Sequence, residues 1–204
     1  QSLARRAVEI KERTRGPDGR QTALSLVNLA LVLRESGAYA EARPLFERAR
    51  SILERPGKAE DPALLACINN LAQLLQSSGE LDEARRLFEH VLAVREGSLG
   101  PDDALVAKSL NNLAMLLMDL GDPRAALPLA RRALEIREKK LRPEDPLLAS
   151  SLNNVGWILH SVGDLAAARP LYERALKLRE ATLAPDHPFL ASTIENLALV
   201  VEEI

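Results

Sequence analysis

A chain of 204 residues is long enough for one domain or two, and 47% hydrophobic with 27% charged residues is the composition of an ordinary globular protein. The net charge of −2 excludes the basic surface that nucleic acid or an acidic membrane would require, and no apolar run approaches the roughly 18–20 residues that cross a bilayer. The single cysteine excludes an internal disulfide and fits either a reducing compartment or indifference to redox conditions, and we expect a cytoplasmic protein.

Apolar residues recur with helical spacing along the whole chain, and they predict an all-α fold. Aromatic residues are only 3% of the sequence, so Leu, Ala, Val and Ile must build the core. Leu and Ala are both favourable in helices. In chain order, the expected helices cover residues 1–14, 22–36, 40–55, 63–78, 82–96, 105–120, 124–140, 147–162, 166–181 and 189–204.

One five-residue stretch recurs on every second helix of this series, and it indicates a repeat array. It reads Leu-Asn-Asn-Leu-Ala at residues 110–114, and its second polar position is always asparagine. These asparagines follow one another at intervals of 42 residues, at Asn28, Asn70, Asn112, Asn154 and Asn196. A constant period of this size predicts stacked helix pairs, because one pair cannot bury both of its apolar faces alone.

The period predicts a single array with an incomplete repeat at each end. Residues 1–20 match the second helix of a repeat, residues 21–62, 63–104, 105–146 and 147–188 form full repeats, and residues 189–204 match a first helix. We therefore expect a right-handed α-α superhelix that is a piece of a longer protein. An unpaired last helix would favour self-association through the apolar residues that it exposes, Leu190, Ile194, Leu197 and Val201.

Turn and capping residues mark the helix boundaries. A glycine, which reaches the left-handed conformation at low cost, follows the first helices at Gly37, Gly79, Gly121 and Gly163. An aspartate that can cap free N–H groups precedes the next first helices at Asp61, Asp103 and Asp145, and His187 weakens that cap in the last copy. Prolines are expected near the start of the second helices, where a missing N–H costs least, at Pro44, Pro128 and Pro170.

Each second helix carries an apolar stripe that we expect to be buried. In the first copy it consists of Ala42, Leu45, Phe46 and Ala49. The later copies read Ala84, Leu87, Phe88, Val91, then Ala126, Leu129, Ala130, Ala133, then Ala168, Leu171, Tyr172, Ala175. Small residues on the first helices are expected to let this stripe approach closely, at Ala30, Ala72, Ala114 and Gly156.

The order of small residue, large apolar residue, glycine, alanine and large apolar residue resembles the tetratricopeptide repeat family. It is met by Ala72, Leu75, Gly79, Ala84 and Phe88, whereas Val91 stands where the family has another small residue. The common repeat of this family has about 34 residues. The period of 42 and the Leu-Asn-Asn-Leu-Ala stretch resemble the kinesin light chain branch of the family. The resemblance implies that the first helices line a concave groove, which binds a peptide or a partner helix.

The predicted groove combines a row of asparagines with a more variable column of side chains. Asparagine both donates and accepts, so a row of asparagines can hold an extended peptide backbone. Methionine adapts to ligands and tryptophan is a common binding anchor, so the variable column would provide specificity. The predicted groove residues are Asn28, Asn69, Asn70, Gln73, Lys108, Asn111, Asn112, Met115, Met118, Asn153, Asn154, Trp157, His160 and Asn196.

A second interpretation stays open for several of these residues. The asparagines can instead hydrogen-bond between neighbouring helices and fix the stack. Trp157, Met115 and Met118 can fill seams in the core, and His160 can be a bystander at the edge of the groove. Cys67 is interpreted as a small buried residue rather than as a nucleophile.

We predict a non-catalytic module for protein–protein interaction, part of a larger scaffold or adaptor. The sequence contains no metal-ligand cluster, phosphate-binding loop, nucleophile elbow or cofactor motif. The alternatives are a structural or self-assembling spacer and a regulatory arm of a multidomain signalling enzyme. Only Arg34 and Lys108 supply cations to the predicted groove, so neither the chaperone-tail adaptor nor the motor-cargo adaptor of the family is predicted.

Overall fold

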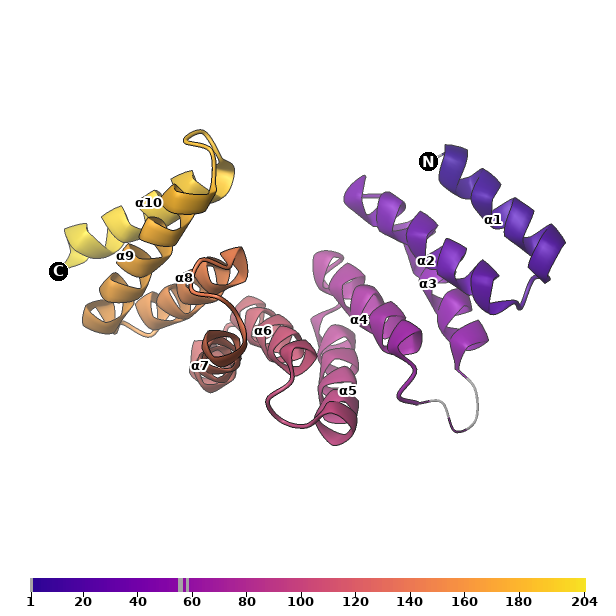
Figure 1. The fold of residues 1–204 in the computed structure, drawn as a ribbon, viewed down its shortest axis with the longest axis horizontal. Helices are drawn as coiled ribbons and strands as arrows, with labels where there is room; N and C mark the ends of the chain where they lie inside the picture. The colour runs from indigo at the N-terminus through magenta and orange to yellow at the C-terminus, as the bar shows by residue number, and fades with distance from the viewer. Residues whose placement is uncertain (1, 55–56, 58) are drawn as a thin grey trace. The chain divides into compact units, whose positions relative to one another are not determined.

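The computed structural model describes residues 2–54, 57 and 59–204, and this part of the chain contains helices and no strand (Figure 1). The all-α fold is therefore confirmed. Each expected helix is present with ends within three residues of the prediction; Gln1 and Arg55, which two predicted helices include, lie outside the described residues. The helices are α1 Ser2–Arg15, α2 Arg20–Glu35, α3 Tyr39–Leu53, α4 Pro62–Ser77, α5 Leu81–Leu99, α6 Ala104–Asp119, α7 Pro123–Lys140, α8 Pro146–Ser161, α9 Leu165–Thr182 and α10 Pro188–Glu203.

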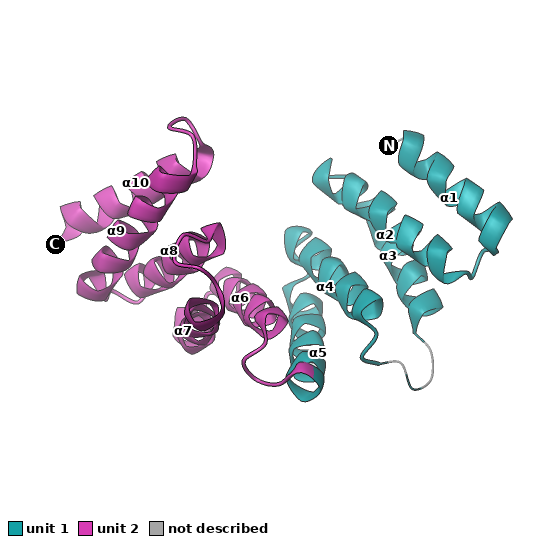
Figure 2. Ribbon diagram, in the orientation of Figure 1, with its two compact units in different colours: residues 1–98 teal, residues 99–204 magenta. Residues whose placement is uncertain are grey.

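The helices form two compact units, residues 1–98 and residues 99–204 (Figure 2). In the first unit α1 packs on α2, α2 on α3 and α3 on α4, and α2 also contacts α4. In the second unit the consecutive helices α6 to α10 pack on one another, and α8 also contacts both α6 and α10. First helices of neighbouring repeats are therefore in direct contact within each unit. The predicted division into one array with repeat boundaries stays a prediction.

The glycines after the first helices have the conformation that the sequence predicts. Gly37, Gly79, Gly121 and Gly163 have positive φ angles of 77°, 87°, 76° and 83°. In the second unit, for example, the Gly121 N–H donates to the Met118 carbonyl and the next N–H donates to the Leu117 carbonyl. The carbonyls at the end of the helix are thus satisfied while the chain reverses into the next helix.

The predicted caps form at the starts of the first helices. The carboxylates of Asp61, Asp103 and Asp145 accept backbone N–H groups two residues further on, at 2.8, 2.7 and 2.9 Å. His187 takes the same position before α10, and its Nδ1 accepts the Phe189 N–H at 3.1 Å. An imidazole nitrogen therefore performs the capping role that a carboxylate oxygen performs in the other copies.

The prediction about the prolines was wrong. Pro44, Pro128 and Pro170 each lie five residues after the first residue of α3, α7 and α9, inside these helices. At that depth a residue would normally donate to a carbonyl one turn earlier within the same helix. Each proline therefore removes one internal hydrogen bond, instead of occupying a first turn that has none.

The core lies between the first and second helices of each pair. On α3 the side chains of Ala42, Phe46 and Ala49 are fully buried, but Leu45 is only half-buried. The equivalent leucines of the later copies, Leu87, Leu129 and Leu171, are also half-buried, which corrects the expected stripe at that position. The expected exposure of the last helix also needs a correction, because Leu190 is buried and Leu197 half-buried, whereas Ile194 and Val201 are exposed.

One close approach in this core requires glycine. A Cβ atom added to Gly156 on α8 would lie 3.0–3.2 Å from ring atoms of Tyr172 on α9. The Tyr172 side chain is completely buried, so the ring has little room to move away. One period earlier, Ala114 and Ala130 occupy the equivalent positions. The small residue of the first helix is therefore matched to the size of the residue that faces it.

We expect Gly156→Ala to destabilise the protein by about 1 kcal/mol or more, although alanine is about 1 kcal/mol better than glycine inside a helix. In a Tyr172→Ala background, which recreates the Ala114 and Ala130 combination, the same change should stabilise the protein. Urea denaturation of the wild type, both single variants and the double variant measures this coupling. Equal effects of Gly156→Ala in the two backgrounds would contradict the contact.

An ion pair in the first unit joins α2 to the start of α4. The Arg20 guanidinium donates to both carboxylate oxygens of Asp61, with Nη2 3.0 Å from Oδ1. This contact, together with the backbone N–H of Ala63, lowers the pKa of Asp61 to about 2, although partial burial acts in the opposite direction. A carboxyl group whose pKa is lower in the folded state than in the unfolded state stabilises the fold above the unfolded pKa of about 3.9.

Asp61→Asn should lower the free energy of unfolding at pH 7 by at most about 1 kcal/mol, because Asn keeps the cap and the exposed guanidinium side of the pair is screened by solvent. The difference between wild type and variant should disappear as the pH falls from 4 towards 2, where Asp61 itself becomes protonated. Asp103→Asn is the matched control, because Asp103 caps α6 in the same way and no ion pair is described for it. This variant should change the free energy of unfolding less than Asp61→Asn does. Chemical denaturation between pH 2 and 7 makes both comparisons.

Candidate functional site

The second unit brings the repeated asparagines of its three first helices to one side. They lie in the middle of α6, α8 and α10, and α8 contacts the other two helices. The residues are Asn111, Asn112, Asn153, Asn154 and Asn196, and all of them are half-buried. We call this side of α6, α8 and α10 the asparagine face.

Hydrogen bonds between neighbouring first helices link these asparagines. Asn154 Nδ2 donates to Asn111 Oδ1 at 3.0 Å, and Asn196 Nδ2 donates to Asn153 Oδ1 at 3.3 Å. The second asparagine of one repeat therefore bonds to the first asparagine of the repeat before it. The sequence predicted a stacking or backbone role for the invariant second asparagine, but it did not predict this partner.

The links leave much of each side chain free to bond again. A carboxamide has two N–H donors and an oxygen that accepts two hydrogen bonds, and each link uses one donor and one acceptor. The linked side chains also lose rotational freedom before any ligand arrives. The asparagine face thus presents oriented donors and acceptors, and stacking and binding are compatible roles for the same residues.

The first unit has a less regular version of this surface. Val27 occupies the position of the first asparagine on α2 and cannot accept a hydrogen bond through its side chain. Arg34 instead donates to Gln73 Oε1 on α4 at 2.7 Å. Asn28 is exposed and Asn70 is half-buried, whereas Asn69 is buried, so Asn69 is poorly placed to contact a ligand.

Apolar side chains lie one turn beyond the asparagines on the same helices. Trp157 on α8 is 39% exposed, so part of its surface packs against the protein and part is accessible to a partner. Met115 and Met118 on α6 are half-buried, and Leu199 on α10 is exposed. His160 follows on α8, where its Nε2 lies 3.0 Å from Glu203 Oε2 on α10. The predicted column of specificity residues is accessible at Trp157.

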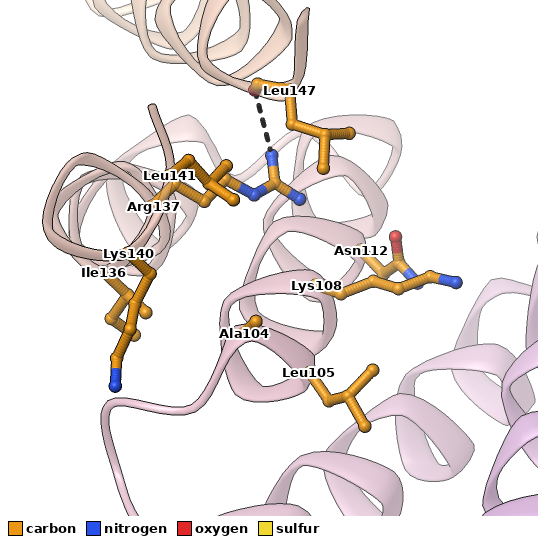
Figure 3. Close-up of a pocket in the computed structure, with 9 residues that line it drawn as sticks. All are labelled: Ala104, Leu105, Lys108, Asn112, Ile136, Arg137, Lys140, Leu141 and Leu147. Atoms are coloured by element: carbon orange, nitrogen blue, oxygen red, sulfur yellow. Dashed lines mark hydrogen bonds between the residues drawn. The ribbon is translucent and has the colours of Figure 1, made fainter. Parts of the chain in front are cut away.

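A pocket of about 410 Å³ opens beside this face, between α6, α7 and the start of α8 (Figure 3). Of the residues that line it, the sequence prediction included only Lys108 and Asn112. The others are Ala104, Leu105, Ile136, Arg137, Lys140, Leu141 and Leu147. The sequence contained a signal for this apolar surface, because Leu105, Leu147 and Phe189 recur at the period of 42. In the structure these three residues are 44, 51 and 58% exposed.

Sequence reasoning also missed a set of buried arginines near the ends of the second helices. Arg137 on α7 donates through Nη1 to Ser151 Oγ and to the Leu147 carbonyl on α8. One period later, Arg179 donates in the same way to Thr193 Oγ1 and the Phe189 carbonyl on α10. Burial lowers the pKa of both guanidinium groups. These two arginines connect α7 to α8 and α9 to α10.

The described residues offer little for catalysis. Cys67 is buried, its Sγ lies 3.5 Å from the Phe46 carbonyl oxygen, and burial raises the pKa of the thiol to about 12. A thiol in this state is not a nucleophile at neutral pH. Among the residues that the structure describes, no three His, Cys, Asp or Glu side chains gather to hold a metal ion. Nor does any helix in this part of the chain have the length and apolar character to cross a membrane.

Stacked helix pairs with a polar row on their first helices define a helical repeat protein of the solenoid class. A family model described as tetratricopeptide repeat matches residues 1–55, 64–139, 105–181 and 147–204. The chain belongs to the tetratricopeptide repeat family. Repeats of this family generally mediate protein–protein interaction and are generally non-catalytic.

Solved structures of kinesin light chain-like arrays are similar to this chain, as the 42-residue period predicted. BtubC (BKLC) from P. vanneervenii is 26% identical with a TM-score of 0.85, and the match covers 98% of this chain and 81% of that one. A kinesin light chain with nearly identical TPR-like repeats from Podosopora anserina is 26% identical with a TM-score of 0.75, covering 87% of this chain and 84% of that one. The comparison with curated proteins finds no match.

Asn111→Ala and Asn154→Ala should each lower the free energy of unfolding by about 1 kcal/mol, because each removes one side of the same hydrogen bond. The double variant should be little worse than either single variant, giving a coupling energy of about 0.5–1 kcal/mol. Asn111 and Asn153 belong to different links, so their double variant should be additive. Denaturant titration measures both cycles, and an additive Asn111 and Asn154 pair would count against the link.

Proposed function

We propose that the asparagine face binds an extended peptide segment of a partner protein, with the asparagines on the peptide backbone and Trp157 as the main apolar anchor. The observation that carries this proposal is the exposure of Trp157 beside the linked asparagine pairs. Met115, Met118 and Leu199 extend the apolar column on either side of Trp157.

The spacing of the pairs suits an extended backbone. Neighbouring packed helices are about 8–10 Å apart, so successive asparagine pairs recur at about that distance. An extended chain advances about 3.3 Å per residue, so each pair would meet every third residue of the peptide. Because the links already restrict the carboxamides, binding costs less side-chain entropy than it would for free asparagines.

The apolar column favours a peptide with a large apolar side chain at the level of Trp157. Tryptophan is enriched among the residues that dominate binding energy, and methionine repacks around ligands of different shape. The backbone contacts are the same in each repeat, so they carry no sequence information. Selectivity for a partner therefore comes from this column.

The wider setting follows the family. A tetratricopeptide array generally serves protein–protein interaction, and this supports a role as part of a larger scaffold or adaptor in the cytoplasm. Self-association is a second candidate, because Ile194 and Val201 on α10 are both exposed apolar residues. A monomer by light scattering at all concentrations would remove that candidate without touching the peptide proposal.

A display library of random 12-residue peptides, selected on the immobilised 204-residue protein, provides the ligand for the test. We expect Trp157→Ala to weaken the selected peptides at least tenfold, as loss of an anchor does. Lys177→Ala changes an exposed residue on α9, away from the asparagine face, and should leave affinity unchanged. Calorimetric titration gives the affinities, and circular dichroism confirms folding.

Equal affinity of folded Trp157→Ala and wild type for every selected peptide would overturn the anchor. If Lys177→Ala, rather than Trp157→Ala, weakened the affinity of the selected peptides, the peptides would bind to the second helices and not to the asparagine face.

A further inference from the structure

The pocket between α6, α7 and the start of α8, which we call the α6–α7–α8 pocket, has walls of two kinds. Leu105, Ile136, Leu141 and Leu147 make an apolar lining. Lys108, Arg137 and Lys140 add positive charge, and no acidic residue lines the pocket. Its volume of about 410 Å³ lies in the range of small-molecule sites, which are mostly apolar with a few placed polar groups.

The cations of the pocket come from two helices, Lys108 from α6 and both Arg137 and Lys140 from α7. The Arg137 guanidinium reaches from α7 towards α6, below the side chain of Leu147 (Figure 3). In the same view the side chains of Lys108 and Lys140 extend on opposite sides of this guanidinium. Both lysines are exposed. Each ammonium group lies at the end of a flexible four-carbon side chain, so it can move over a bound molecule.

Arg137 gives the pocket a charge that the described residues do not neutralise by direct contact. Arg137 is only 9% exposed, and the two groups to which its Nη1 donates, the Ser151 hydroxyl and the Leu147 carbonyl, are neutral. Asp145, just before α8, favours the charged guanidinium electrostatically, but no carboxylate in the described part of the chain is shown in an ion pair with Arg137, and burial has the larger effect on its pKa. A buried cation without a paired anion favours the arrival of negative charge.

The next repeat supplies a natural comparison. A smaller pocket of about 240 Å³ occupies the equivalent place between α8, α9 and α10, with Arg179 in the position of Arg137. There Ser150 and Thr182 replace Lys108 and Lys140. The two lysines are therefore not needed to stack repeats, and they distinguish the larger pocket from its neighbour.

We propose that the α6–α7–α8 pocket binds a small amphiphilic anion, a molecule with an apolar body and one carboxylate or sulfonate group. The apolar body lies against Leu105, Leu141 and Leu147, and the anionic group lies among Lys108, Arg137 and Lys140. Asn112 belongs both to this pocket and to the asparagine face, but Trp157 does not line the pocket, so failure of the peptide anchor would not contradict this proposal.

The probe for the test is 8-anilinonaphthalene-1-sulfonate, an amphiphilic anion whose fluorescence rises in an apolar site. Lys108→Ser with Lys140→Thr installs the residues of the neighbouring pocket. Lys139→Thr with Lys177→Ser removes the same charge from exposed positions that do not line the pocket. Fluorescence titration of the three folded proteins gives their affinities, and octanoate, octanol and octyltrimethylammonium are compared as competitors.

We expect the pocket variant to bind the probe at least tenfold more weakly than the control variant, which should resemble the wild type. Octanoate should displace the probe from the wild type far better than octanol does, and octyltrimethylammonium should not displace it. Equal affinities of the pocket and control variants would overturn the proposal, as would displacement by octyltrimethylammonium as effective as that by octanoate.

Discussion

A helix pair in this protein has more apolar surface than its two members can cover for each other, and every other feature follows from that constraint. The remaining apolar face must be buried against the next pair, so the chain repeats and stacks. Close contact within a pair then depends on the size of facing residues. At Gly156 and Tyr172 a large ring is accommodated because the opposite residue has no side chain.

Polar side chains connect one repeat to the next. The asparagine links join first helices, whereas Arg137 and Arg179 join a second helix to the first helix that follows. In the junction between α3 and α4, Leu53 and Cys67 occupy the positions of Arg137 and Ser151, and both are buried. An apolar pair thus joins α3 to α4 at the position where a hydrogen-bonded pair joins the helices of later repeats. This agrees with the small net contribution of buried polar pairs to stability.

These connections leave two surfaces with different chemistry in the second unit. The asparagine face is polar, oriented and similar from repeat to repeat, with Trp157 as its distinctive side chain. The α6–α7–α8 pocket is apolar and cationic, and its lysines occur in one repeat only. Residues that recur at every period build the stack, while residues that vary between copies make one repeat different from another. In the proposed function, recognition of a partner depends on the variable positions.

The helices of the described part of the chain could be predicted to within three residues at each end, because helix periodicity, capping aspartates and turn glycines are local signals that each occur several times. The prolines inside α3, α7 and α9 were misplaced because helix packing tolerates an interruption that local rules would avoid. For the candidate site, the sequence alone predicted the asparagine row and Trp157, since their spacing assigns them to one face of each first helix.

Only the tertiary structure decided which asparagine bonds to which, that Asn69 is buried, and that Arg137, Lys140 and Leu147 meet Lys108 in a pocket. Those contacts join residues from different helices, and their distances depend on how the helices pack. A period along the chain determines the order of the elements, whereas the space left between three packed helices depends on side-chain volumes that no periodicity encodes.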